Sequence, residues 1–149
     1  MTVDLYVQTS TKNPARHKTV KAKWLICTKS NGQEVKRDGT VVLNNSTAKQ
    51  AALVALSDAL SRFNKAAVIR IYISDDFVRN MLIANMPKRW EDNGWHKIRL
   101  NQTLAHETQW KYVKGFLTGH AVSFARAEEL ADNQILKEME WRMNNVRGK

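Results

Sequence analysis

Apolar and polar residues alternate along the first third of the chain. Val3–Val7 is short and rich in strand formers, and in Val20–Ile26 apolar residues alternate with basic ones, the period of a strand with one solvated face. Asn31-Gly32 fits the left-handed positions of a tight hairpin turn. The returning strand is expected over Glu34–Arg37 and Thr40–Leu43. This pattern predicts a meander of three antiparallel strands.

The period then becomes helical. Thr47 and Gln50 have the spacing of a capping box, in which each side chain satisfies a free backbone amide. The apolar residues expected on the buried face of this helix are Ala52, Leu56, Ala59, Leu60 and Phe63. Val68–Ile73 is apolar enough for a central strand, and Asp75 with Asp76 predicts the start of a second helix, because carboxylates favour the positive helix end. Its predicted buried face is Phe77, Val78, Met81 and Leu82.

Pro87 interrupts this second helix. The elements expected after it are a short piece over Lys88–Trp95, a helix over Leu100–His106, a fifth strand over Gln109–Lys114 and a long helix over Ala121–Met143. A helix that connects the third strand to the fourth makes part of the sheet parallel. The predicted class is therefore α/β, with a five-stranded mixed sheet (three antiparallel strands, then two parallel) and helices packed on it.

Composition narrows the setting of this fold. A chain of 149 residues with 43% hydrophobic residues predicts one globular domain over 1–149. No apolar run reaches the roughly 20 residues of a membrane span. Met1–Leu5 lacks the basic and apolar stretches of a secretory signal, and the single cysteine, Cys27, cannot form an internal disulfide. We therefore expect a cytoplasmic protein.

Charge points to a class of partner. Lys and Arg total 24 against 14 Asp and Glu, which gives a net charge of +10. A small basic protein is attracted to polyanions, and no basic amphipathic helix with a clean apolar face suggests a membrane surface. Nucleic acid is the expected partner and a membrane is not, although charge that serves only solubility is the alternative.

Five segments occur in the order and spacing of one known family. They are Asn44-Asn45 with Ala51–Leu56, Asp76–Arg79, Trp90 with Gly94-Trp95, Trp110–Gly115, and Arg126–Ala131. Over nearly its whole length the chain resembles the type 1 ribonuclease H family. The resemblance implies the ribonuclease H-like fold and an enzyme that cuts the RNA strand of an RNA–DNA hybrid. In that family two Mg²⁺ ions, held chiefly by four carboxylates, stabilise the attacking and leaving oxygens.

The resemblance fails at the catalytic positions. The four family carboxylates fall here on Gln8, Ala48, Ser74 and Glu128, of which Glu128 alone is acidic. Two close divalent cations need several negative charges between them, so no metal or other cofactor is expected. The family's mobile histidine, which follows its fifth strand, falls on Phe116, with His120 as a conceivable stand-in.

A rebuilt site is the alternative at these positions. A shift of one residue places Asp75, in place of Ser74, at the third family position. Asp75 and Glu128, together with Glu129 or Asp132, would then form a site that binds Mg²⁺. The competing interpretation is that Asp75 and Asp76 only begin a helix.

The residues implied to bind nucleic acid are largely kept. Asn13, Asn44 and Asn45 correspond to amides near the minor groove, where neutral amides bond 2′-hydroxyls and sugar oxygens. The early basic residues, which form either a phosphate-binding patch or a solvated sheet face, are Lys12, Arg16, Lys18, Lys21 and Lys23. In the family's basic protrusion, the handle, Trp90 and Trp95 either contact nucleic acid or pack onto the domain. Lys88, Arg89, His96, Lys97 and Arg99 flank an altered stretch, Glu91–Asn93.

Three hypotheses follow. The first is a catalytically inactive ribonuclease H-like domain that binds nucleic acid, either an RNA–DNA hybrid or structured RNA. The second is a metal-dependent ribonuclease H-type nuclease with the rebuilt site. The third is a protein-interaction or scaffold module that uses an exposed sheet edge or the C-terminal helix with Met139, Trp141 and Met143.

Overall fold

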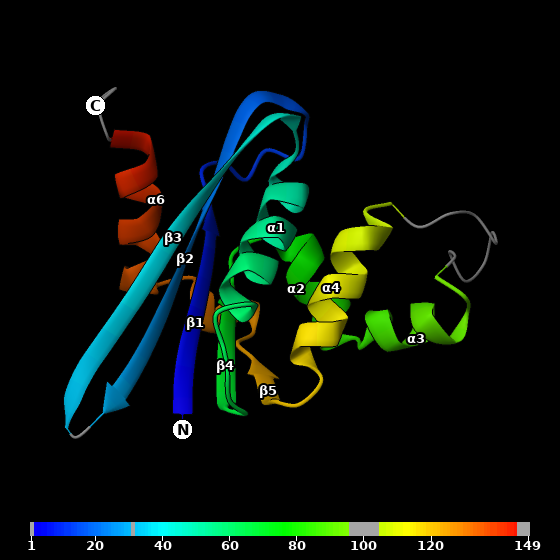
Figure 1. Cartoon of the computed structure of the whole chain (residues 1–149). Helices are drawn as coiled ribbons and strands as arrows, with labels where there is room; N and C mark the ends of the chain where they lie inside the picture. The colour runs from blue at the N-terminus through cyan, green and yellow to red at the C-terminus, as the bar shows by residue number, and fades with distance from the viewer. Residues whose placement is uncertain (1, 31, 96–104, 146–149) are drawn as a thin grey trace.

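The computed structural model describes residues 2–30, 32–95 and 105–145, and contains one five-stranded sheet with strand order β3-β2-β1-β4-β5 (Figure 1). The strands are β1 (Thr2–Thr9), β2 (His17–Ser30), β3 (Gln33–Ser46), β4 (Val68–Ile73) and β5 (Ala121–Phe124). β1, β2 and β3 pair antiparallel, whereas β4 and β5 run parallel to β1. The predicted mixed sheet is confirmed.

Helices cover both faces of this sheet. They are α1 (Ala48–Leu60), α2 (Asp76–Ile83), α3 (Met86–Asp92), α4 (Glu107–Leu117), α5 (Ala127–Leu130) and α6 (Gln134–Asn145). α1 packs on β1, β2 and β3 and against α4, while α6 packs on β1 and β2 from the other side (Figure 1). Side chains of β1 alternate accordingly, with Leu5 and Val7 in the core under α1 and Tyr6 in the smaller cluster under α6.

The β2–β3 hairpin is longer than predicted and its return strand is continuous. Gly32, at φ +79°, occupies the predicted turn, while Asn31 lies outside the described residues. β3 passes through Gly39, the partner of Trp24 on β2. A Cβ at Gly39 would lie 2.6 Å from ring atoms of Trp24, so this glycine leaves the space that the fully buried indole fills.

α1 begins as its sequence predicts. Thr47 Oγ1 accepts the backbone N–H of Gln50 at 3.2 Å. The reciprocal bond of a capping box is replaced, because the Gln50 side chain is hydrogen-bonded to the Ser46 hydroxyl. All the apolar residues of α1 except Val54 are buried, and they form the centre of the main core.

The predicted fifth strand is wrong. Gln109–Lys114 lies within α4, where Trp110 and Val113 are buried three residues apart and Tyr112 is exposed. That spacing is the period of a helix face, although alternation of Trp110 with Tyr112 also suits a strand. The segment that pairs with β4 is Ala121–Phe124, so the Trp110–Gly115 motif was matched to the wrong element.

The predicted long C-terminal helix is also wrong, because it includes the segment that forms the fifth strand. Ala121–Met143 divides into β5, the four-residue α5 and α6. On α6, Met139 and Met143 cover the core, whereas Trp141 is 64% exposed. The predicted helix over Leu100–His106 falls mostly on residues outside the described ones, and His106 is the N-cap of α4.

Within the described ranges, none of the helices is both long enough and apolar enough to cross a bilayer.

Candidate nucleic-acid interface

The carboxyl ends of β1 and β4 meet at one edge of the sheet. Val7 is paired with Ile73, and the Ser74 backbone N–H donates to the Val7 carbonyl at 3.1 Å. Gln8 and Ser74 therefore leave adjacent parallel strands, and both side chains are buried, with 3% and 6% of their surface exposed. Ala48, the first residue of α1, is buried as well. The structure thus describes the first three predicted catalytic positions as buried, uncharged side chains.

The amide of Gln8 is used by the fold. Its Nε2 donates to the Leu136 carbonyl of α6 at 3.1 Å, and its Oε1 accepts the Thr9 backbone N–H at 3.0 Å. The side chain therefore joins β1 to α6, and both ends of its amide are bonded within the fold.

Ser74 and Arg79 are unusual because each carries a buried polar atom without a partner. No described group bonds Ser74 Oγ or Arg79 Nε. The rest of the Arg79 guanidinium, 4% exposed, donates to the Ile73 carbonyl at 3.0 Å and pairs with Asp76 at 2.5 Å. A buried polar atom left without a bond costs about 1–3 kcal/mol, so a partner from solvent or from a ligand at these two atoms would stabilise this edge.

Both residues line one hollow of about 300 Å³. Its walls come from the ends of β1 and β4, from α2 and from the α5–α6 segment. The charged residues that line it are Lys12, Asp76, Arg79, Lys137 and Glu140. A second hollow of about 270 Å³ shares Lys12, Ser74 and Asp76 and extends toward α1.

The rebuilt site requires acidic side chains that converge. Asp75 instead caps α2, because its Oδ2 accepts the Val78 N–H at 3.0 Å, and burial raises the pKa of this carboxyl. Glu129 is bonded to the Arg126 N–H and to Arg70, and Asp132 lies 3.7 Å from Lys137. Glu128 is exposed on α5 and lines neither hollow. Asp75 and Asp76 begin α2, as the sequence predicts.

A pair of Mg²⁺ ions does not fit these side chains. Magnesium needs oxygen ligands, mainly carboxylates, and here one amide oxygen is already bonded, Ala48 has no donor, and a guanidinium lies beside Ser74. Across the described part of the chain, no three His, Cys, Asp or Glu residues are grouped so that they would hold a metal ion.

Amides lie at the same end of the sheet. Asn44 and Asn45 are exposed where β3 ends, and their side chains have no described partner. Asn45 adopts a left-handed conformation, at φ 50°, and its carbonyl accepts a hydrogen bond from Arg16. Asn13 Oδ1 accepts the Ala15 N–H at 2.9 Å within an exposed turn. The two Asn44 and Asn45 amides are therefore available to a ligand.

The early basic residues do not form one patch. Lys12 and Arg16 lie in the loop between β1 and β2, near the interface. Lys21 and Lys23 alternate with the buried Val20, Ala22 and Trp24, so they project from the other face of the sheet, where Lys23 pairs with Asp38 at 2.9 Å.

Three residues at this edge were not predicted as site residues, and one of them, Phe77, was wrongly predicted to be buried. Lys49 lies in the first turn of α1, with its Nζ 3.9 Å from the ring centroid of Phe77, which is 42% exposed. The pKa of His106 is lowered by burial and by the nearby charges of Lys49 and Arg16, which places the imidazole among these cations. A lysine at the positive end of a helix is the one signal that the sequence offered, because that position disfavours cations.

Solved structures share this fold. LC9-RNase H1, a type 1 RNase H with the type 2 active-site motif, matches with a TM-score of 0.72 at 16% identity, over 95% of this chain and 69% of that chain. RNase H1 from the halophilic archaeon Halobacterium salinarum NRC-1 matches with a TM-score of 0.54 at 17% identity, over 91% of this chain and 94% of that chain. LC11-RNase H1, in complex with RNA/DNA hybrid, matches with a TM-score of 0.55 at 10% identity, over 90% of this chain and 92% of that chain.

The chain has the ribonuclease H-like fold. Neither a scan of protein-family models nor a search of curated proteins finds a match. TM-scores of 0.54–0.72 establish the shared fold, whereas identities of 10–17% leave the function to be argued from the side chains.

The handle of this ribonuclease H-like chain is held by packing. Trp90 is buried and its ring makes an edge contact with Trp110, at 5.0 Å between centroids. Trp95 is partly buried against the same core. Lys88 pairs with Asp92 at 2.7 Å, and Arg89 contacts the Met86 sulfur. These contacts support the packing interpretation of both tryptophans; the flanking His96, Lys97 and Arg99 lie outside the described residues.

The fold also corrects the position of the mobile histidine. Because β5 ends at Phe124, the loop after it begins at Ala125, and neither Phe116 nor His120 follows that strand. His120 lies just before β5, where its Nδ1 accepts the Ala67 N–H at 3.0 Å. It is a structural residue at the opposite end of the strand.

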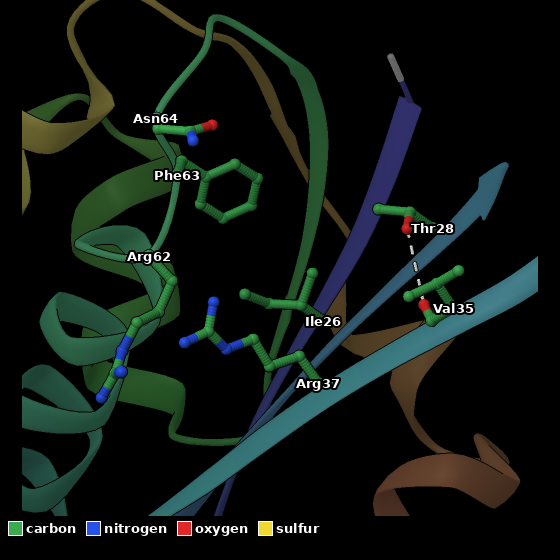
Figure 2. A pocket seen from close by; sticks show the side chains of 7 residues that line it. All are labelled: Ile26, Thr28, Val35, Arg37, Arg62, Phe63 and Asn64. Atoms are coloured by element: carbon green, nitrogen blue, oxygen red, sulfur yellow. Dashed lines mark hydrogen bonds between the residues drawn. The ribbon is translucent and has the colours of Figure 1, made fainter.

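A separate hollow of about 180 Å³ lies at the opposite end of α1 (Figure 2). It is lined by Ile26, Thr28, Val35, Arg37, Arg62, Phe63 and Asn64. In Figure 2 the Arg37 side chain extends from the hairpin toward α1 and the Phe63 ring lies above it. Arg62 is paired with Asp58 at 3.0 Å. None of the predicted site residues lines this hollow.

Proposed function

We propose that this protein binds an RNA–DNA hybrid or a structured RNA through the sugar–phosphate backbone and does not cut it. The observation that carries the proposal is the composition of one edge. Free amides of Asn44 and Asn45 lie there with unpaired cations, while the adjacent strand ends present the uncharged Gln8 and Ser74.

Recognition of an RNA-containing duplex suits this chemistry. Such duplexes are bound by shape, by 2′-hydroxyl contacts and by phosphate contacts rather than by base edges. An amide supplies both donors and an acceptor for hydroxyl and sugar oxygens. LC11-RNase H1 is a solved neighbour of the same fold in complex with RNA/DNA hybrid, which supports a hybrid as the ligand. The net charge of +10 supplies the attraction to phosphate.

The absence of cleavage follows from the donor set. Hydrolysis by two metal ions requires that both ions be held about 4 Å apart by negative ligands. Gln8 Oε1 accepts from Thr9, and Asp75 Oδ2 accepts from Val78. Since these groups are used by the fold, we expect no metal cofactor and no nuclease activity.

The test is a titration of fluorescently labelled hybrid, double-stranded RNA and double-stranded DNA, with binding followed by anisotropy and strand length by gel, in Mg²⁺. We expect affinity for the RNA-containing duplexes and intact strands. The double variant Asn44→Ala, Asn45→Gly removes both amides and keeps the left-handed backbone at position 45. It should lower affinity for the hybrid about tenfold, from two hydrogen bonds worth about 0.5–1.5 kcal/mol each.

Asn64→Ala, which removes an exposed amide at the remote hollow, is the matched control and should bind as the wild type does. A wild-type protein without affinity for any duplex at low salt would refute the proposal. Cleavage that needs Mg²⁺ and disappears in both Asp75→Asn and Glu128→Gln would instead establish the rebuilt nuclease.

A further inference from the structure

The hollow between β1, α1 and α2 has the character of an anion pocket. The residues that matter in its lining are Lys12, Lys49, Ser74, Asp75, Asp76 and Phe77. Its volume, about 270 Å³, is below the roughly 300–1,000 Å³ of sites for drug-sized ligands, so it suits a small group.

Ser74 gives this pocket a donor that nothing in the fold uses. Its side chain is 94% buried, with 6% of its surface exposed, and its hydroxyl has no described partner. Buried hydroxyls are nearly always bonded, so this residue at a pocket wall has a donor to offer to a water or to a ligand.

Two lysines line the same pocket without a described ion pair, although the charge of Lys49 acts on Asp75 and opposes the rise of its pKa. No described acidic group lies within ion-pairing distance of Lys12 or Lys49. The Nζ of Lys49 rests 3.9 Å from the Phe77 ring centroid, which holds the charge at the wall of the pocket.

The two carboxylates of the lining are used elsewhere. Asp75 accepts the Val78 N–H and caps α2. Asp76 pairs with the buried Arg79 at 2.5 Å. Both carboxylates thus have a donor within the fold, while Lys12, Lys49 and the Ser74 hydroxyl are hydrogen-bond donors that no described acceptor uses.

Resting on the proposed function, we infer that this pocket binds one phosphate of the nucleic-acid backbone directly, through Lys12, Lys49 and the Ser74 hydroxyl. Lysine is a point-charge donor that suits phosphate oxygens. The phosphate occupies the end of β4 without a bridging metal ion. Its binding is therefore independent of divalent cations except through ionic screening.

The test measures the salt dependence of hybrid binding in the double variant Lys12→Gln, Lys49→Gln. Loss of one phosphate contact reduces the slope of log affinity against log salt by about 1 and lowers affinity at low salt on the order of tenfold. Lys29→Gln, Lys65→Gln removes the same charge from two exposed lysines that line neither hollow, and should keep the slope.

Ser74→Ala separates binding from folding. Because it removes a buried hydroxyl that has no partner, the variant should unfold at the same urea concentration as the wild type or at a higher one. Its affinity for the hybrid should nevertheless fall, which a purely structural residue would not cause.

The outcomes are distinguishable. A wild type that binds no duplex refutes the proposed function. A wild type that binds the hybrid, with an unchanged slope in Lys12→Gln, Lys49→Gln and unchanged affinity in Ser74→Ala, refutes the phosphate pocket alone. Calorimetry with inorganic phosphate distinguishes the source: phosphate bound through the same residues, with no hybrid bound, would overturn a backbone ligand.

Discussion

Two neutral side chains, Gln8 and Ser74, determine what the end of the β1–β4 pair can bind. Because both side chains are buried, little solvent is left to stabilise a cation there. Negatively charged protein side chains would have to stabilise it. One amide is bonded to Leu136 and Thr9, and one hydroxyl is left without a partner. At the scale of single residues, this edge is therefore suited to accept an anionic group rather than a metal pair.

Restoring the missing charges should change that preference. The triple variant Gln8→Asp, Ala48→Glu, Ser74→Asp places carboxylates at the three positions implied by the resemblance. We expect Mg²⁺ to stabilise the folded triple variant by about 2.7 kcal/mol when Mg²⁺ is 100-fold above its Kd. Its melting temperature should therefore be higher in Mg²⁺ than in EDTA.

The wild type, melted in the same two buffers, should show no such difference. A wild type that gains as much as the triple variant, or a folded triple variant that gains nothing, would show that these residues do not control metal binding.

Asp75 makes the stability of the protein depend on pH. Burial raises the pKa of its carboxyl above the ordinary 3.8, so the folded state holds this proton more tightly than the unfolded chain does. Its stabilising contribution is complete below pH 3.8 and is lost as pH rises through the higher folded pKa.

Asp75→Asn, neutral at every pH and able to cap α2, should therefore gain stability over the wild type near neutral pH and lose that advantage in acid. Urea unfolding of both proteins at about pH 7 and about pH 3.5 measures this difference in the free energy of unfolding. Asp132→Asn, at an almost fully exposed carboxylate, supplies the baseline. An advantage that is constant or grows in acid would contradict burial as the cause.

At the scale of elements, strong periodicity was predictable and short segments were not. The alternation in β2 and the apolar face of α1 are local consequences of burial, so the sequence predicted both. Four residues, Ala121–Phe124, carry too little pattern to identify a strand, and their pairing with β4 depends on contacts distant in sequence. The sequence consequently predicts a strand over Gln109–Lys114, which lies in α4.

The site was predictable to a similar extent. Its strand-end positions and asparagines followed from the resemblance. Lys49 and Phe77 were not predicted as a pair, because their contact joins the starts of α1 and α2, which only the tertiary fold brings together. Conversely, the register of β2 separates Lys21 and Lys23 from Lys12, which proximity in sequence had grouped.

Gly39 supports the β2–β3 hairpin by leaving room for Trp24. Gly39→Ala places a methyl 2.6 Å from the indole and should destabilise the protein by about 1–3 kcal/mol, measured by urea unfolding. Gly115→Ala is the matched control, since its Cβ meets nothing within 4 Å inside α4. It should stabilise by roughly 0.5–1 kcal/mol. Equal effects of the two substitutions would contradict the steric role of Gly39.

At the scale of the whole molecule, the net charge of +10 provides long-range attraction, and the fold decides where it acts. Several cations are already paired, among them Lys23 with Asp38 and Lys88 with Asp92. Lys12 and Lys49 remain unpaired beside the free asparagines. Unpaired charge and amide donors thus coincide at one edge of the sheet.

Binding of labelled RNA–DNA hybrid in Mg²⁺ and in EDTA, at matched ionic strength and with strand length followed in the same samples, tests this arrangement most directly. Equal affinity in the two buffers with both strands intact is the expected result. Affinity that requires Mg²⁺, or an RNA strand shortened only when Mg²⁺ is present, would contradict it.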